Sequence, residues 1–254
     1  SLTGSKLIND IYTQGTNAYL SSDFGIIVLD LINLEIEATY IIGDNGQSVA
    51  CYDFSQAEDT LYAVTQEGLK YAFLDGSNLL DFQSWSTVNA SITEGIEHWN
   101  NSCFVHSLDS VYQLYSLDSL IPLMPLNGYE EVYLASSDSL YLVQTEGDLV
   151  SGIVDSSQIL VWKDAGFELR LSGISSYPMD IVQTGQNIYI SDYRGGLREV
   201  FSDNTQTRRF IGGQRYSAKA FRIEPGINKI WVSSGSTDFG LGKIYNIPLN
   251  NQKL

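Results

Sequence analysis

One short pattern recurs six times along the chain and limits the folds that the chain can adopt. Each copy has an aromatic residue between two apolar ones, then a few small or polar residues, a Gly or Ser, and a second apolar run. The aromatic residues are Tyr19, Tyr62, Phe104, Tyr141, Tyr189 and Trp231. Successive copies are about 42 residues apart, which is the length of a four-stranded propeller blade. Helical repeats of this length need amphipathic helices, and no segment here keeps a convincing period of 3.6 residues.

Each repeat divides into segments of strand length. In the first repeat, residues 7–13 predict an inner strand, 16–22 a second, 26–31 a third and 35–42 an outer one. The Gly or Ser before the third segment supplies the backbone freedom that a tight hairpin needs. The aromatic residue of the second strand is expected to fill the space between neighbouring sheets, which pack about 10 Å apart. We therefore assign the six aromatic residues to the core and not to a sugar-binding surface.

The fold class that follows is an all-β propeller of about six four-stranded blades, the last of them incomplete. The approximate blades are 5–43, 44–89, 90–128, 129–172, 173–213 and 214–254, within a single domain spanning 1–254. The sixth repeat has strands at 217–223, 229–234 and 242–248 but no outer strand. An open ring would expose sheet edges and apolar faces, which native chains avoid. We expect the chain to be part of a longer multidomain protein that completes a ring of about seven blades; a tighter curl or a partner chain would also close it.

The composition is that of a packed globular chain. Hydrophobic residues make up 43% and charged residues 17%, which differs from the composition of disordered chains. No apolar run reaches the roughly 18 residues of a transmembrane helix. The chain begins at Ser1 without a Met or a signal-peptide pattern, so we expect either a processed protein or a piece of a longer one.

Charge is distributed unevenly along the chain. The formal net charge of −16 argues against a nucleic-acid partner, whose phosphates would be repelled. Residues 1–162 contain 22 of the 30 acidic residues and two basic ones, Lys6 and Lys70. Residues 163–254 contain the other 12 basic residues and 8 acidic ones. This division predicts one acidic face and one mildly basic face, although solubility alone would also explain the acidic residues.

Repeat five and the start of repeat six carry a basic cluster that is the best candidate binding site. Its members are Arg194, Arg198, Arg208, Arg209, Arg215, Lys219 and Arg222, of which we assign the first five as binding residues. Such a patch suits a phosphate, a carboxylate or an acidic partner protein, with Arg favoured for bidentate contacts. The alternative is that these are solvated charges of outer strands, which also discourage edge pairing.

The cysteines and histidines do not form a recognisable catalytic or metal site. Cys51 and Cys103 lie in apolar runs and are interpreted as small buried residues, with a structural disulfide or a reactive thiol as the alternative. His106 follows a core triplet and is expected to be a hydrogen-bonded structural histidine. His98 ends an inner strand and could line a central channel. Neither a nucleophile–base signature nor enough ligands for zinc is present.

Two groups of oxygen-bearing side chains are candidates for a calcium site or a catalytic site. Residues 43–46 read Gly-Asp-Asn-Gly, a sequence that is more typical of a turn than of a calcium-binding loop. Four acids are expected near inner strands: Asp10, Asp53, Glu97 and Asp180. They are either hydrogen-bonded channel residues or a carboxylate pair for glycoside hydrolysis. We predict no catalytic residue, no metal ligand and no cofactor, and therefore a protein that is not an enzyme.

Two segments resemble a known family. Residues 22–43 read SDFGIIVLDLINLEIEATYIIG, and residues 78–85 read NLLDFQSW. They resemble the PorZ N-terminal propeller family, surface components of the type IX secretion system of Bacteroidetes. They also resemble the wider two-component-regulator propeller repeats of these bacteria. The likeness is sharp over about the first 90 residues and only repeat-like afterwards. In that family a few strands precede the position of Ser1, which agrees with an unfinished ring.

The resemblance implies a function but assigns no active site. It implies a non-catalytic scaffold at the outer-membrane surface that helps to attach secreted cargo to anionic lipopolysaccharide, with other type IX secretion proteins as partners. One alternative is a periplasmic propeller of a hybrid two-component regulator that senses a glycan. A second alternative is a propeller-type polysaccharide lyase or glycoside hydrolase, which would need a clustered acid pair or Tyr–His pair on one face.

Overall fold

The computed structural model describes residues 7–117, 119–126, 129, 131–148, 153–164, 166–173, 177–192, 196–201, 207–210, 220–226, 229–234 and 243–248. Within these ranges, side chains are described as far as residue 201, apart from those of residues 131, 148 and 153–155. The chain groups into two compact units, residues 1–127 and residues 128–254, and each unit is described separately.

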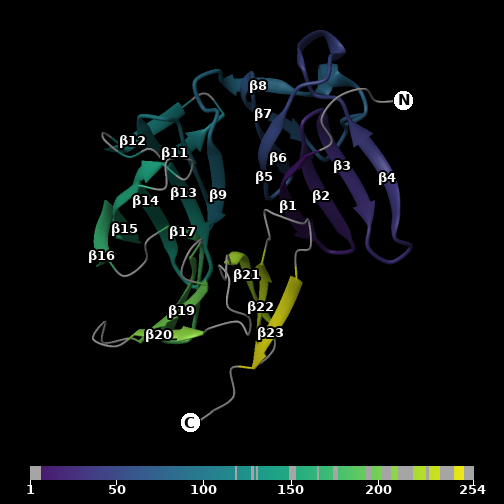
Figure 1. Cartoon of the computed structure of the whole chain (residues 1–254). Helices are drawn as coiled ribbons and strands as arrows, with labels where there is room; N and C mark the ends of the chain where they lie inside the picture. Colours follow the sequence, from purple (N-terminus) through teal and green to yellow (C-terminus); the bar gives the residue numbers. More distant parts are fainter. Residues whose placement is uncertain are drawn as a thin grey trace. The chain divides into compact units, whose positions relative to one another are not determined.

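The first unit contains three sheets, each a four-stranded antiparallel meander (Figure 1). The first sheet consists of β1 (Ile8–Gln14), β2 (Asn17–Ser22), β3 (Gly25–Asp30) and β4 (Glu35–Tyr40). The second consists of β5 (Cys51–Ala57), β6 (Thr60–Thr65), β7 (Gly68–Phe73) and β8 (Ser86–Asn89). The third consists of β9 (Gly95–Trp99), β10 (Ser102–His106), β11 (Ser110–Ser116) and β12 (Ser119–Pro125). Two 3-10 helices lie in connections: η1 (Asp44–Gly46) between β4 and β5, and η2 (Phe82–Ser84) between β7 and β8.

The second unit also contains three sheets with strands in sequence order. The first consists of β13 (Glu131–Ser136), β14 (Leu140–Asp148), β15 (Ile153–Lys163) and β16 (Gly166–Ser172). The next consists of β17 (Pro178–Thr184), β18 (Asn187–Asp192), β19 (Gly196–Val200) and β20 (Thr207–Phe210). The last consists of β21 (Ala220–Gly226), β22 (Lys229–Ser234) and β23 (Lys243–Pro248).

These sheets confirm the all-β propeller architecture but correct the number of blades. We expected about six four-stranded blades with the last incomplete, whereas the described residues form five four-stranded sheets and one three-stranded sheet. The reason is that the sixth repeat pairs β21, β22 and β23, and no described strand pairs with the outer edge of β23. The larger ring and the single domain stay predictions.

The glycine of the repeat pattern has a double role at the turn between the second and third strands. Gly25 has a φ angle of 128° and Gly68 one of 107°, and residues other than glycine rarely adopt such backbone conformations. A Cβ at Gly25 would also lie 2.2 Å from the Tyr40 carbonyl oxygen in the outer strand. The hydroxyls of Ser22 and Thr65 donate to the carbonyls of these two glycines at 2.8 Å. The turn and the pairing of the outer strand therefore both depend on this glycine.

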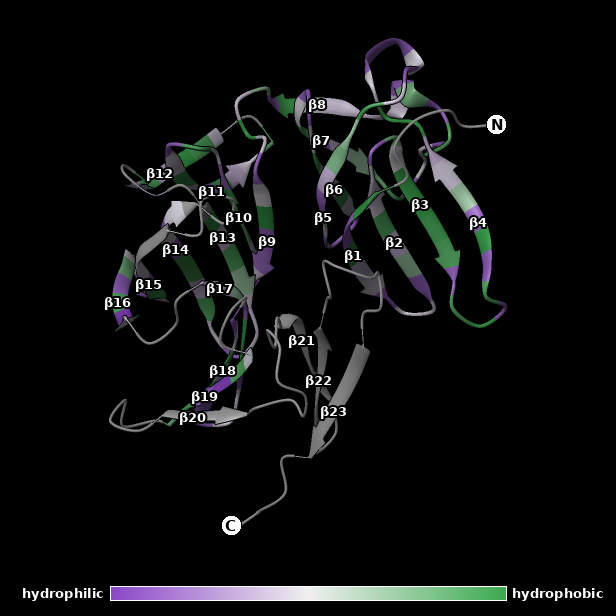
Figure 2. Cartoon of the chain, viewed as in Figure 1, coloured by the Kyte–Doolittle hydropathy of each residue, from purple (hydrophilic) through white to green (hydrophobic). Residues whose placement is uncertain are grey.

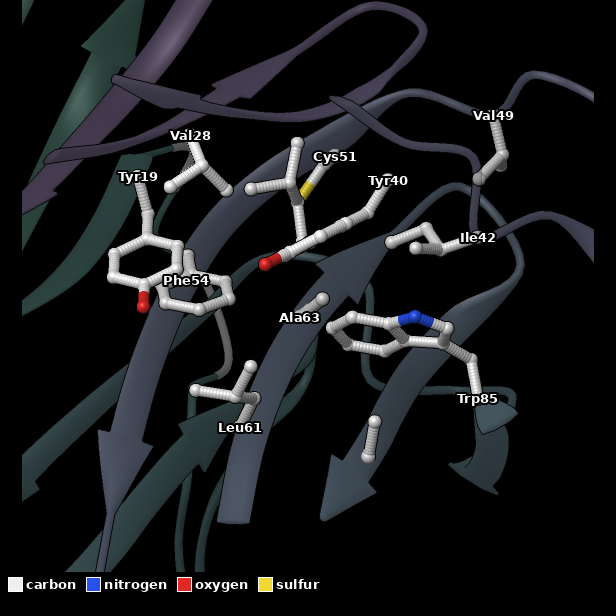
Figure 3. Packing of buried hydrophobic residues seen from close by; sticks show 12 residues of the cluster. Tyr19, Val28, Tyr40, Ile42, Val49, Cys51, Phe54, Leu61, Ala63 and Trp85 are labelled. Carbon is white, nitrogen blue, oxygen red and sulfur yellow. The ribbon is translucent and has the colours of Figure 1, made fainter. Parts of the chain in front are cut away.

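Within each unit, the hydrophobic core lies between successive sheets. Figure 2 shows that β3 is largely hydrophobic, and its Ile26 and Val28 side chains are buried in the cluster of the first two sheets. One cluster joins the first two sheets of the first unit, and the side chains of Tyr19 and Phe54 stack there with ring centroids 4.8 Å apart (Figure 3). A second cluster joins the second and third sheets through Tyr62 and Ile96. In the second unit, Tyr141 belongs to the cluster between its first two sheets.

The aromatic series is core, as predicted, wherever its side chains are described. Five of the six are at most 8% exposed, namely Tyr19, Tyr62, Phe104, Tyr141 and Tyr189. The side chain of Trp231 lies outside the described part. Cys51 and Cys103 are buried free thiols, which confirms the interpretation as small core residues and excludes a disulfide between them. Burial raises the pKa of both thiols to about 12, so neither is a reactive thiolate at neutral pH.

Candidate functional site

The inner strands carry acids at a recurring backbone irregularity. The pairing register shifts between Ile8 and Asp10 in β1, between Cys51 and Asp53 in β5, and between Pro178 and Asp180 in β17. Each shift inserts one extra residue, a β-bulge, directly before the acid. The prediction that Asp10, Asp53, Glu97 and Asp180 lie on inner strands is therefore confirmed, with Glu97 on β9.

Asp53 shows what the acid does at such a bulge. One carboxylate oxygen, Oδ1, accepts the backbone N–H of Phe54 at 2.7 Å. The other, Oδ2, accepts the N–H of Ile96 in the inner strand of the next sheet at 2.9 Å. Asp180 repeats the first bond, since its Oδ1 accepts the N–H of Ile181 at 2.8 Å. The acid at the bulge thus satisfies backbone donors that the strand ladder leaves without partners.

Three inner-strand acids of the first unit lie close enough to influence one another. Burial raises the pKa of Asp53 well above its usual value, and the charges of Asp10 and Glu97 raise it further. The two backbone N–H bonds oppose these effects only in part. A carboxylic acid with a raised pKa beside other carboxylates is one requirement of a glycosidase. However, both oxygens of Asp53 already accept backbone N–H groups, as expected of a structural residue that links two neighbouring sheets.

Asp180 belongs to the second unit, so the structure does not place it relative to the other three acids. His98 lies on β9 one residue before the end of the strand, as expected. Among the described residues, no group of three or more His, Cys, Asp or Glu side chains is arranged to hold a metal ion. The described inner strands therefore show an acidic cluster in the first unit but no assembled metal centre.

His106 is the buried neighbour of this cluster. It is 3% exposed and lies directly opposite Gly95 in the pairing of β10 with β9. A Cβ at Gly95 would lie 2.5 Å from His106 Nε2 and 3.3 Å from Asp53 Oδ2, so the imidazole occupies the space that a side chain at position 95 would need. Burial lowers the pKa of His106 to about 4, so the ring is neutral at pH 7. The structural role is as predicted. Nδ1 makes no hydrogen bond of standard geometry within the described residues, and an interaction with the Ser107 backbone opposes the lowering of the pKa only in part.

The Gly-Asp-Asn-Gly segment forms the turn that was predicted. Asn45 and Gly46 have positive φ values of 61° and 74°. Asp44 Oδ1 lies 2.8 Å from the Nζ of Lys70, and Glu67 Oε2 lies 2.9 Å from the same nitrogen. The Asp44 carboxylate therefore neutralises an ammonium group here. Lys70 itself is 1% exposed, and its burial could not be predicted from the sequence beyond its position in an apolar strand.

The predicted binding cluster is described only in part. Arg198 lies on β19, and its Nε donates to the Oδ2 of Asp192, a buried carboxylate, at 3.3 Å. Arg208 and Arg209 lie on β20, where Arg209 is the register partner of Arg198, but their side chains are outside the described part. Arg194, Arg215 and Lys219 lie outside the described residues, and Arg222 is described only as part of β21. The structure therefore gives Arg198 a structural partner and does not assemble the other members.

Comparison with known proteins supports the interpretation of the sequence. Residues 1–86 match the family described as "TSS9, PorZ, N-terminal beta-propeller domain". The resemblance to PorZ is confirmed. The match covers the first sheet and strands β5 to β7 of the second, and it ends at the first residue of β8. A comparison with curated proteins gave no significant match.

Solved structures share the fold along almost the whole chain. PorZ from Porphyromonas gingivalis, a surface component of the type IX secretion system, is 18% identical with a TM-score of 0.60; the alignment covers 95% of this chain and 33% of PorZ. The extracellular domains of two hybrid two-component systems from B. thetaiotaomicron are each 15% identical with TM-scores of 0.63. These alignments cover 98% and 92% of this chain and 35% and 32% of those chains. The chain thus spans about a third of each relative, and such identities establish a shared fold only.

Proposed function

We propose that the chain is a non-catalytic binding propeller of a type IX secretion complex at the outer-membrane surface. The observation that carries this proposal is the match of residues 1–86 to the PorZ N-terminal propeller family. The full-length protein would act with other type IX secretion proteins to attach secreted cargo to anionic lipopolysaccharide. In this proposal, 1–254 is one propeller domain, and further sequence completes its ring.

The role of the inner-strand acids supports binding over catalysis. A general acid needs a proton-donating oxygen within hydrogen-bond reach of the substrate. In Asp53 both oxygens accept backbone N–H groups, and one of these bonds joins two sheets. None of the helices in the described residues has the length and apolar character needed to span a membrane.

We place the contact with the anionic group in repeat five. The segment 163–254 carries more basic than acidic residues, in contrast to the rest of the chain. Arg208 and Arg209 are adjacent on β20, the outer strand of its sheet. Arg194 and Arg215 are the other candidates, whereas Arg198 already pairs with Asp192. Arginine suits this role because its guanidinium group binds phosphate or carboxylate through two parallel hydrogen bonds.

Binding of the full-length protein to purified anionic lipopolysaccharide tests this proposal. Arg208→Glu is expected to weaken binding by about tenfold, because it replaces a contact charge with a repelling one. Lys163→Glu is the matched control, since it makes the same charge change at a side chain that is 56% exposed and paired with Glu168. Equal binding by Arg208→Glu, Arg209→Glu and wild-type proteins would exclude repeat five as the contact. In cells, deletion of the gene is expected to release cargo into the medium.

A second candidate function is a periplasmic propeller that senses a glycan for a hybrid two-component regulator. It is favoured by the structural similarity to the two extracellular domains from B. thetaiotaomicron. The two functions predict different genes. A regulator requires a membrane-spanning segment and a kinase downstream of this propeller, whereas the PorZ arrangement does not. Sequencing the gene on both sides of the chain therefore distinguishes them.

A further inference from the structure

The hairpin that joins β3 to β4 carries a cluster of exposed apolar side chains. The exposed fractions are 40% for Leu31, 72% for Ile32, 75% for Leu34 and 64% for Ile36. In Figure 2 the turn of this hairpin is coloured as hydrophobic while the neighbouring positions of β4 alternate with hydrophilic ones. Single exposed apolar residues are normal, but four within six positions form a patch of the kind that marks interaction sites.

The backbone at this turn does not explain the apolar residues. Asp30 Oδ1 accepts the N–H groups of Ile32 and Asn33 at 2.7 and 3.1 Å, and the Asp30 carbonyl accepts the N–H of Leu34 at 2.8 Å, so none of the bonds that form the turn involves an apolar side chain. Leu34 has φ 57°, a conformation in which Asn or Gly is favoured and a Leu is strained. A leucine at this position is therefore unfavourable both for the local conformation and for hydration. Burial against a partner would compensate for both.

The free edge of β4 is poorly suited to pairing with a strand of another protein. β4 is the outer strand of its sheet, so one of its edges is unpaired among the described strands. However, the register of β4 shifts between Val28 and Leu29, which leaves Glu37 in a bulge, and Glu35 and Glu37 are both exposed. Bulges and edge charges are devices that prevent pairing with another strand. The apolar side chains of the hairpin remain as the contact surface.

Charge defines the partner. Asp30, Glu35 and Glu37 lie within the same hairpin as the apolar residues. Residues 1–127 contain 16 acidic residues and two basic ones, and one of these, Lys70, is buried between two carboxylates. An anionic lipid surface or a second copy of this unit would be repelled by such a surface. A protein with an apolar patch bordered by Lys or Arg would be attracted to it.

We propose that the β3–β4 hairpin is a docking site for a partner protein that presents an apolar patch bordered by basic side chains. Leu34 and Ile32 enter the apolar patch of the partner, and Glu35 and Glu37 pair with its basic border. This site goes beyond the binding of anionic lipopolysaccharide in repeat five and requires the opposite charge on its ligand. Either site can therefore fail without the other.

Two fluorescein-labelled synthetic peptides test the proposal with the full-length protein. Both are amphipathic helices with the same leucine pattern, and one carries Lys and the other Glu at its polar positions. The Leu–Lys peptide is expected to bind, and Leu34→Asn is expected to weaken it by about tenfold, the effect of removing one large buried apolar side chain. Asn tolerates the positive φ at this position, so this variant should keep or raise the temperature of unfolding.

A matched variant separates docking from general attraction. Leu108 is also 75% exposed but lies in a turn of the third sheet, so Leu108→Asn is expected to leave binding of the Leu–Lys peptide unchanged. Ile32→Ser is a second hairpin variant that is expected to bind the Leu–Lys peptide more weakly than the wild-type protein does. No binding of the Leu–Lys peptide by the wild-type protein, equal binding of the Leu–Glu peptide, or equal binding by Leu34→Asn would each overturn the proposal. The proposal would also be overturned if Leu108→Asn weakened binding of the Leu–Lys peptide as much as Leu34→Asn does.

Discussion

Replacing Gly95 by Ala tests how closely the second and third sheets of the first unit are packed. The new methyl group would lie 2.5 Å from His106 Nε2, whereas ordinary contacts begin at 3.4 Å. The imidazole is 3% exposed, so it cannot turn into solvent and must shift within the core. Such overpacking costs about 2–3 kcal/mol of the free energy of unfolding, and Ala gains back about 0.5–1 kcal/mol because Gly is unfavourable within a strand. The net expected loss is about 2 kcal/mol.

A double-mutant cycle isolates this contact. In His106→Ala the imidazole is absent, so the methyl group at position 95 has room and only the gain over Gly remains. Gly95→Ala should then stabilise by about 0.5 kcal/mol, which gives a coupling free energy of roughly 2–3 kcal/mol between the two positions. Urea unfolding followed by the fluorescence of the buried Trp85 measures all four proteins. A coupling below about 0.5 kcal/mol would refute the packing argument.

Three further predictions follow from buried ionisable groups and from the turn. The pKa of His106 is about 4 in the folded chain and about 6.5 when unfolded, so its contribution to stability is complete above pH 6.5 and is lost as the pH falls toward 4. The loss at pH 5 is about 2 kcal/mol, and it should be missing in His106→Asn when urea unfolding is compared at pH 7 and pH 5. Removing both partners of Lys70, in Asp44→Asn with Glu67→Gln, should destabilise by about 3 kcal/mol because a buried ammonium group is left without a counter-charge. Lys70→Met should cost clearly less, since the acids retain access to water; a larger cost in thermal unfolding would contradict this. Asp30→Ala should lower the unfolding temperature of the first unit, because Asp30 accepts three hydrogen bonds within the β3–β4 turn; an unchanged temperature would contradict it.

The blades could be predicted from the sequence because their signals are local. The aromatic triplets and the Gly or Ser that follows them recur along the chain, and both can be recognised from a few neighbouring residues. Tyr19 is buried because of its place in the second strand, and Gly25 is required by its φ angle and by the nearby Tyr40 carbonyl. The incomplete sixth sheet was predicted from the same local signals. The expected number of four-stranded blades was about six, whereas the described residues form five.

The site residues were harder to predict because their partners are distant in the sequence. Lys70 meets Asp44 across 26 residues, and Asp53 meets Ile96 across 43. Arg198 was assigned to the basic binding cluster, yet it pairs with Asp192 on the neighbouring strand. The apolar hairpin had a readable signal, since Leu31, Ile32 and Leu34 surround the turn at Asn33, but an apolar turn and an apolar strand look alike in a sequence.

The bulges explain why an inner strand of this fold can resemble a catalytic site. A bulge leaves one backbone N–H outside the ladder, and in β5 and β17 the following Asp accepts the next N–H itself. The β21 strand has the same irregularity between Ala220 and Arg222, with an arginine where the other strands have an acid. An acid at this position therefore accepts a backbone N–H group next to the bulge. Its presence indicates a bulge more directly than it indicates a catalytic residue. Function is better sought where no internal partner explains a residue, as at Leu34 in the β3–β4 hairpin.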